Sequence, residues 1–233
     1  MALTKKEMFG KETRSTYIGG GSLIHKSFVL TAATKVVGEI PTDLMARVGE
    51  FDFASASETF QHDDMMVETI IIHEGFIRRL ARPNNIALLQ LEKPVTLDHH
   101  INIVCLPPPN AKFDNKRCVS TGWGKRQYTD VQFPTLLKKI EMSVIPTPTC
   151  ETALRTESPI DELPPGIICA GGGQEDTCAG DGGSPLVCAG DDNIYHQVGI
   201  VSWGLGCKKV GVPGAYTEVS YYIDWINEKM NVF

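Results

Sequence analysis

The segment Cys178-Ala-Gly-Asp-Gly-Gly-Ser-Pro-Leu-Val-Cys188 constrains the fold more than any other part of this 233-residue chain. It is a loop dense in glycine, placed between two cysteines, that leads directly into an apolar run. The whole chain holds 22 glycines and 14 prolines, which indicates many turns, as in a strand-rich fold. Because all-β barrels commonly reach this length as a single unit, we expect one strand-rich domain.

The cysteines indicate an oxidising environment. Six of the seven lie at positions 118, 150, 169, 178, 188 and 207, and Cys105 is left over. None forms the close C-x-x-C pair of a zinc site, so a disulfide framework in a secreted protein is the better interpretation. Six cysteines allow 15 pairings, and the sequence alone does not choose among them. An odd cysteine suggests a partner outside this chain, and a buried free thiol is the alternative.

Charge and hydropathy exclude several classes of protein. The net charge of -6 argues against a protein that binds nucleic acid or an anionic membrane. No apolar run approaches the ~18 residues of a membrane-spanning helix. The first residues, Met1-Ala-Leu-Thr-Lys-Lys-Glu7, have no apolar stretch of the kind found in a signal peptide. We therefore expect that a signal was removed or, as the favoured alternative, that this chain is a piece of a longer product.

Three segments together resemble the trypsin/chymotrypsin-like serine protease family. Phe28-Val-Leu-Thr-Ala-Ala33, Asn84-Asn-Ile-Ala-Leu-Leu-Gln-Leu91 and the loop at 178–188 are similar to the family blocks Leu-Thr-Ala-Ala-His-Cys, Asn-Asp-Ile-Ala-Leu-Leu-x-Leu and Gly-Asp-Ser-Gly-Gly-Pro. Thr121-Gly-Trp-Gly124 and Ile200-Val-Ser-Trp-Gly204 resemble further blocks in the family order. The resemblance therefore covers nearly the whole chain.

The resemblance implies an all-β fold of two six-stranded antiparallel barrels with a cleft between them. The first barrel would span about 1–105 and the second about 118–220, followed by a C-terminal helix at about 221–230. Residues 1–233 would then form one protease-like domain that lacks the beginning of its first strand. The implied disulfides join the pairs Cys118–Cys188, Cys150–Cys169 and Cys178–Cys207, while Cys105 would be unpaired or joined to a segment outside this chain. A further family bridge is missing, because Gly19 and Lys35 occupy its two positions.

All three positions of the catalytic triad are replaced. The mechanism needs a nucleophile, a base beside it and a carboxylate that orients the base. The resemblance places Gly182, Thr34 and Asn85 at these positions, and glycine has no side chain with which to attack a carbonyl. Ser184 lies two residues beyond the nucleophile position, where the backbone direction differs and no base is expected. We therefore expect a pseudo-protease rather than an enzyme.

The resemblance also implies that the cleft keeps features used for binding. Asp176 matches the acidic base of a trypsin-like specificity pocket, and Gly204 and Gly214 match its open walls. Backbone amides at Gly180 and Gly182 would face the former oxyanion site. The hypothesis is that the pocket accepts an Arg or Lys side chain as a charge-assisted pair, and the alternative is an inherited pocket without use.

Asp181 and an acidic loop provide two further expectations. In active relatives the residue at position 181 receives a freed N-terminal amine. The sequence offers no such amine, so we expect a zymogen-like or rearranged cleft. Glu50 and Glu58 lie in a loop that holds calcium in some relatives, but hard-cation sites need six or more oxygens. A solvated acidic loop is the favoured interpretation, and we expect no metal or other cofactor.

Finer features resemble one subgroup, the clip-domain serine protease homologues of arthropods. Ile103-Val-Cys-Leu-Pro107 and the loop at 178–188 carry this similarity. The resemblance implies a secreted, non-catalytic cofactor or adaptor in an extracellular cascade such as innate-immune melanisation. Its partners would be active proteases, zymogens or prophenoloxidase. A structural or adhesive extracellular scaffold is the alternative, and a trypsin-like endopeptidase is suggested by the family label alone.

Overall fold

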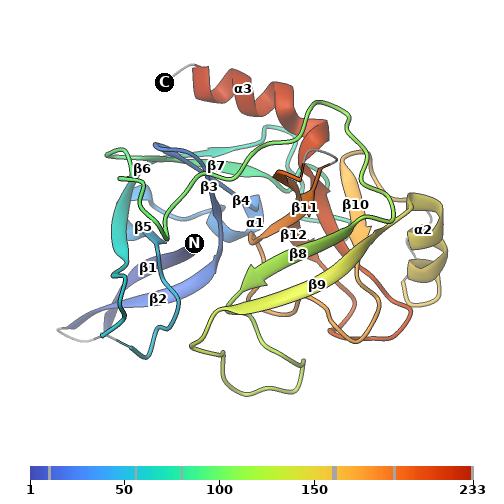
Figure 1. Cartoon of the computed structure of the whole chain (residues 1–233), viewed down its shortest axis with the longest axis horizontal. Helices are drawn as coiled ribbons and strands as arrows, with labels where there is room; N and C mark the ends of the chain where they lie inside the picture. Colours follow the sequence, from blue (N-terminus) through green and yellow to red (C-terminus); the bar gives the residue numbers. More distant parts are fainter. Residues whose placement is uncertain (10–11, 56, 80, 159–161, 191–192, 232–233) are drawn as a thin grey trace.

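The computed structural model describes residues 1–9, 12–55, 57–79, 81–158, 162–190 and 193–231. Two barrel-like units lie side by side, and the C-terminal helix returns to the first of them (Figure 1). The prediction of a mainly β fold with two barrels and a C-terminal helix is confirmed. None of the helices in the described part is long and apolar enough to cross a membrane.

The first unit is a curved seven-stranded sheet with the order β2-β1-β5-β6-β7-β4-β3. Its strands are β1 (Ala2–Phe9), β2 (Glu12–Gly20), β3 (Ser22–His25), β4 (Phe28–Thr31), β5 (Leu44–Val48), β6 (Asp63–Ile72) and β7 (Ala87–Leu91). The sheet forms a half-barrel rather than a closed barrel of six strands. It has seven strands because β2 and β3, at the two ends of the order, are separate strands with only Gly21 between them. Strands β1 and β2 pair as a hairpin, from Ala2 opposite Gly20 to Phe9 opposite Glu12. This hairpin projects at the lower left of Figure 1.

The second unit is a closed barrel with the order β10-β13-β12-β11-β8-β9. Its strands are β8 (Arg117–Gly122), β9 (Lys138–Ile145), β10 (Ile167–Ala170), β11 (Pro185–Ala189), β12 (Tyr195–Trp203) and β13 (Gly214–Glu218). Closure leaves these strands without a free edge, which is where unpaired backbone groups would otherwise be exposed. Within the described residues the α-helices are α1 (Ala33–Val36), α2 (Thr147–Arg155) and α3 (Ile223–Asn231), and short 3-10 helices span Pro41–Asp43 and Val219–Tyr222.

Strand β4 shows how the apolar pattern builds two cores. Successive side chains of a strand point to opposite faces. Val29 therefore packs in the core of the first unit, while Phe28 and Leu30 face the opposite side. On that side Ile223 and Ile226 of α3 complete a second core, and Figure 1 shows α3 lying above the first unit. All four residues of β4 are buried as a result, and α1 begins two residues after this strand ends.

Three disulfides join the pairs that the resemblance implies. Cys118–Cys188 ties β8 to β11, Cys150–Cys169 ties α2 to β10, and Cys178–Cys207 ties two loops beside the cleft. Cys105 is free and exposed in this chain. Because Cys178–Cys207 holds both sides of one pocket, it fixes the loop that begins at Cys178.

Candidate functional site

A cavity of about 380 Å³ lies between the two units. This volume is within the range of ligand sites. The first unit contributes residues of α1 and of the loop before β7, and the second contributes the loop at 178–182 and the end of β12. The lining includes the predicted site residues Thr34, Asp176, Gly180, Gly182, Gly204 and Gly214, and also Lys35, Arg78, Arg82, Tyr128 and Ser202. The structure therefore brings the predicted residues together, with Asn85 directly behind them.

Asn85 connects the two units through hydrogen bonds on both ends of its amide. The Thr34 amide N–H donates to its Oδ1 at 2.9 Å, and its Nδ2 donates to the Ser202 hydroxyl at 2.7 Å. The Thr217 hydroxyl donates to its backbone carbonyl at 2.9 Å. Asn85 is fully buried. A side chain that both donates and accepts suits this place, because buried polar groups need partners.

Lys35 lies against Gly182, the residue predicted at the nucleophile position. A Cβ atom placed on Gly182 would lie 2.5 Å from Lys35 Cε and 3.3 Å from its Nζ. A Cβ on Gly19 would lie 2.9 Å from Lys35 Cδ. Gly19 and the Lys35 stem, which the resemblance places at the two positions of a missing bridge, thus lie in contact. Burial, followed by the charge of Arg82, holds the pKa of Lys35 below its usual value.

Asp181 forms an ion pair with a buried lysine, which the sequence did not predict. Its Oδ2 pairs with Lys138 Nζ at 2.7 Å, and both side chains are buried. The amides of Gly124 and Cys178 each donate to its carboxylate at 2.8 Å. A lysine from β9 thus pairs with Asp181, the residue that would receive an N-terminal amine in active relatives, and holds the loop at 178–184 in place.

Ser184 does not enter the cavity. Its side chain is buried, and it packs against Gly20 of β2. Its amide donates to the Asp181 carbonyl at 3.0 Å, and its own carbonyl accepts from Val201. The hydroxyl therefore lies in the contact between the two units and cannot reach a ligand in the cleft.

The carboxylate of Asp176, at the base of the acidic pocket, is only partly hydrogen-bonded within the described residues. Asp176 is buried, its Oδ2 accepts a hydrogen bond from the Lys208 amide at 3.2 Å, and its Oδ1 has no partner among the described residues. Burial raises the pKa of Asp176 to about 6. A Cβ on Gly214 would lie 3.5 Å from Asp176 Oδ1, so glycine keeps the approach to this oxygen clear.

The amides of Gly180 and Gly182 donate to no acceptor among the residues that the structure describes. Gly180 has a φ of +100°, a conformation that favours glycine. Its carbonyl accepts from the Tyr17 hydroxyl at 2.9 Å, which fixes the orientation of this peptide. Both residues line the cavity, so two backbone donors are available there.

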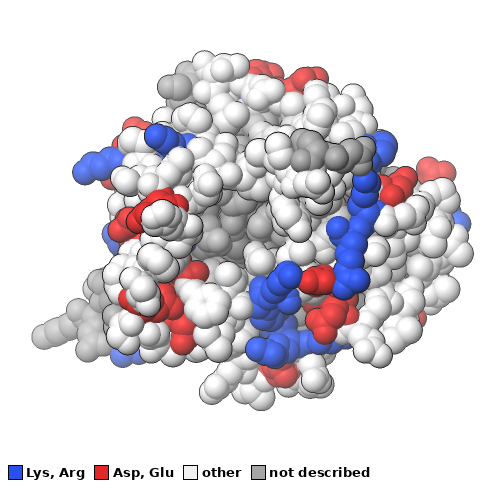
Figure 2. All heavy atoms as spheres, viewed as in Figure 1, with Lys and Arg blue, Asp and Glu red and all other residues white. Residues whose placement is uncertain are grey.

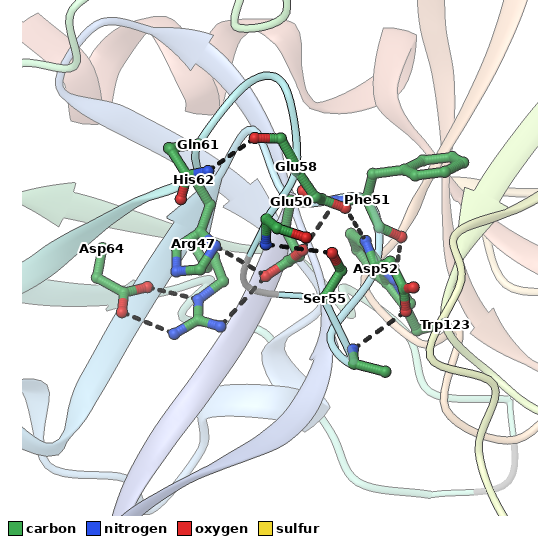
Figure 3. Close-up of polar contacts among 12 residues, drawn as sticks. Arg47, Glu50, Phe51, Asp52, Ser55, Glu58, Gln61, His62, Asp64 and Trp123 are labelled. Carbon is green, nitrogen blue, oxygen red and sulfur yellow. Dashed lines mark hydrogen bonds and ion pairs between the residues drawn. The ribbon is translucent and has the colours of Figure 1, made fainter.

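The acidic loop after β5 is closed by protein contacts (Figure 3). Glu50 Oε2 lies 3.2 Å from Arg47 Nη1 and 3.1 Å from His62 Nδ1, and its Oε1 accepts from the Phe51 amide. Glu58 accepts from the Asp52 amide at 2.8 Å. Calcium at Glu50 and Glu58 would have to displace these donors, so this arrangement does not fit the ion. The expectation that this loop holds no metal stays a prediction.

Some of the surface charges on the face shown in Figure 2 form ion pairs. Lys and Arg side chains gather over β8 and β9, with acidic side chains among them. Arg117 and Lys139 both contact Glu141, at 2.6 Å and 2.7 Å. These exposed pairs contribute little to stability, and they make this face a mixed, solvated surface.

Comparison with known proteins identifies the family. The profile of the family described as Trypsin matches residues 6–226. The chain belongs to the trypsin family. Among relatives in this family, Inactive CLIP domain-containing serine protease A28 of Anopheles gambiae is 39% identical over 98% of this chain and 59% of its own length. Inactive CLIP domain-containing serine protease A8 of the same species is 39% identical over 93% of this chain and 60% of its own length.

A third trypsin-family relative carries a different kind of name. Phenoloxidase-activating factor 2 of Galleria mellonella is 39% identical over 93% of this chain and 73% of its own length. The chain spans about three fifths of the length of the two Anopheles proteins. The resemblance to clip-domain serine protease homologues is thus confirmed for the protease-like part that the chain shares with them.

Two lysines of this trypsin-family cleft are not among the predicted site residues. The sequence presents Lys35 only as the replacement of a cysteine, and no local pattern marks Lys138 within its strand. Arg82 belongs with Arg78 and Arg79 to a basic stretch of the sequence, for which a solvated face is the expected role. In the structure Arg82 donates from Nη1 to the Ser202 carbonyl at 2.7 Å.

Proposed function

We propose that this trypsin-family chain is a non-catalytic, secreted cofactor or adaptor of an extracellular proteolytic cascade. The innate-immune cascade that activates prophenoloxidase, which leads to melanisation, is the cascade we favour. The observation that carries the proposal is the stem of Lys35 packed where a nucleophile would stand on Gly182. Thr34 and Asn85 hold the other two triad positions, so the cleft offers neither a base nor its carboxylate.

Two further observations support this proposal. Relatives that share most of this chain are named inactive proteases or a phenoloxidase-activating factor. Three disulfides suit a protein that works outside the cell. The partners we propose are active proteases, zymogens or prophenoloxidase, bound through a surface that keeps the shape of a protease.

Two assays test the proposal. The first incubates the purified protein with a fluorophosphonate probe and with amide substrates, using an active trypsin-family protease in parallel. We expect neither labelling nor turnover; covalent labelling of Ser184 would establish an active enzyme and overturn the proposal.

The second assay reconstitutes the cascade from its purified protease and prophenoloxidase, with and without this protein. We expect phenoloxidase activity to rise when the protein is added. If activity is the same in both mixtures, and the protein instead recovers only matrix proteins from extracellular fluid, the scaffold alternative replaces the cofactor proposal.

A further inference from the structure

The cavity carries opposite charges that lack partners at two separate places. Lys35 Nζ, next to Gly182, has no hydrogen-bond or ion-pair partner among the described residues. Asp176 Oδ1, next to Gly214, is buried and likewise unpartnered in the described part. Buried charge without a partner is costly. A ligand that carries both a positive and a negative group would satisfy both places at once.

The place around Lys35 suits an anion. Arg78 and Arg82 line the same cavity, and the pKa of Arg82 is lowered by burial and then by the charge of Arg78. The nearby carboxylate of Asp181 is already paired with Lys138. A bound carboxylate would relieve the repulsion among these cations. It would also accept from the free amides of Gly180 and Gly182, and such charge-assisted bonds are the stronger kind.

Lys35 and Asp176 line the same cavity of about 380 Å³, so a single ligand has access to both. The pocket over Asp176 suits a guanidinium or ammonium group. Lys35 lies beside Gly182, the predicted nucleophile position, where the carbonyl of the same ligand residue is expected to lie. An uncut peptide presents a neutral amide carbonyl here. A peptide that has been cut presents a carboxylate.

We propose that this cleft binds the carboxyl-terminal residue of a chain that ends in Arg or Lys, with its α-carboxylate on Lys35 and its side chain on Asp176. The inference rests on the proposed cascade function, because proteases with an acidic specificity pocket cut after basic residues and leave such ends behind. The protein would thereby distinguish a cleaved component from its uncleaved precursor.

The test measures fluorescence anisotropy of hexapeptides labelled at the N-terminus. One peptide ends in Arg with a free carboxylate, a second has the same sequence as the C-terminal amide, and a third ends in Gln with a free carboxylate. We expect the first to bind the wild-type protein and the other two to bind about 10- to 100-fold more weakly, since each loses one charged hydrogen-bonding contact.

Variants assign each contact to its residue. Lys35→Met keeps the stem that fills the space at Gly182, so it should fold normally and lose the preference for the free acid over the amide. Asp176→Asn should lose the preference for Arg over Gln. Lys139→Met, which changes an exposed lysine outside the cavity, is the matched control and should bind like the wild type.

Three results would overturn the inference. Equal binding of acid and amide would mean that Lys35 only fills space. Tight binding of free arginine, without any gain from the peptide, would mean that the site is an amino-acid site. If the folded wild-type protein binds none of the peptides, a carboxyl-terminal Arg is not a ligand of this cleft. The peptides test only the cleft, so a cofactor effect that persists in the reconstituted cascade separates failure of this inference from failure of the proposed function.

Discussion

Replacing Lys138 by methionine tests whether the internal ion pair holds the cleft together. The Lys138 side chain reaches Asp181 at 2.7 Å and donates to the Lys125 carbonyl at 2.9 Å. Methionine keeps most of the stem and removes the charge. Asp181 would then be a fully buried carboxylate with two amide donors and no cation.

The expected cost follows from that burial. Breaking a buried pair by removing one partner typically costs about 3–5 kcal/mol. The amides of Gly124 and Cys178 continue to bind the carboxylate, which places Lys138→Met at the lower end, about 3 kcal/mol. For a chain of this size that loss corresponds to a fall in Tm of roughly 6–12 °C.

Urea unfolding and thermal melting of Lys138→Met measure this loss. The matched control is Lys139→Met, one residue along β9, whose side chain is exposed and whose partner Glu141 keeps Arg117; we expect its stability to change by less than about 0.5 kcal/mol. Hydrogen exchange adds a local readout, since the amides of Gly124 and Cys178 should exchange faster in Lys138→Met alone. Equal stability of the two variants, with unchanged exchange, would refute the structural role of the pair.

Three further predictions concern single residues. Asn85→Ala should destabilise the fold by about 1–3 kcal/mol, because the Thr34 amide loses its acceptor, and denaturant unfolding would show no change if this contact were unimportant. Asp176→Asn should stabilise the protein at pH 7.5 but not at pH 3.5. The native pKa of about 6 lies above the ordinary 3.8, so ionisation of Asp176 progressively destabilises the native state between those values, by up to about 3 kcal/mol; thermal melting at the two pH values would contradict this if the variant gained equally at both. Gly183→Ala should destabilise the fold by at least 1 kcal/mol, since φ is +86° and a Cβ would meet the Gly20 carbonyl; a melting temperature equal to that of the wild type would disprove this.

The sequence predicted the features that depend on local composition and on family blocks. The three disulfides and the positions of Thr34, Asn85 and Gly182 follow from segments in which neighbouring residues specify the register. Asp176 was also placed correctly in the cavity, because it lies two residues before a cysteine that fixes the loop. For such residues the neighbouring sequence is enough to predict where they lie in the fold.

The rest depended on contacts between distant segments. Lys138 and Asp181 are 43 residues apart, and only closure of the second barrel aims one at the other. Arg82 and Ser202 are 120 residues apart and belong to different units. A long charged side chain can point in many directions from its backbone, so no local pattern distinguishes the buried Lys138 from the exposed Lys139 beside it.

The contact between Lys35 and Gly182 has a consequence for the residues that position 182 can accept. A serine there would bring its Cβ to within 2.5 Å of Lys35 Cε. Because Cε lies near the free end of a flexible side chain, Lys35 would swing aside rather than block the substitution. The serine alone would still yield no turnover, since it would have no base beside it. The residue at position 182 and the conformation of Lys35 are therefore coupled, and a change at the first would be reported by a movement of the second.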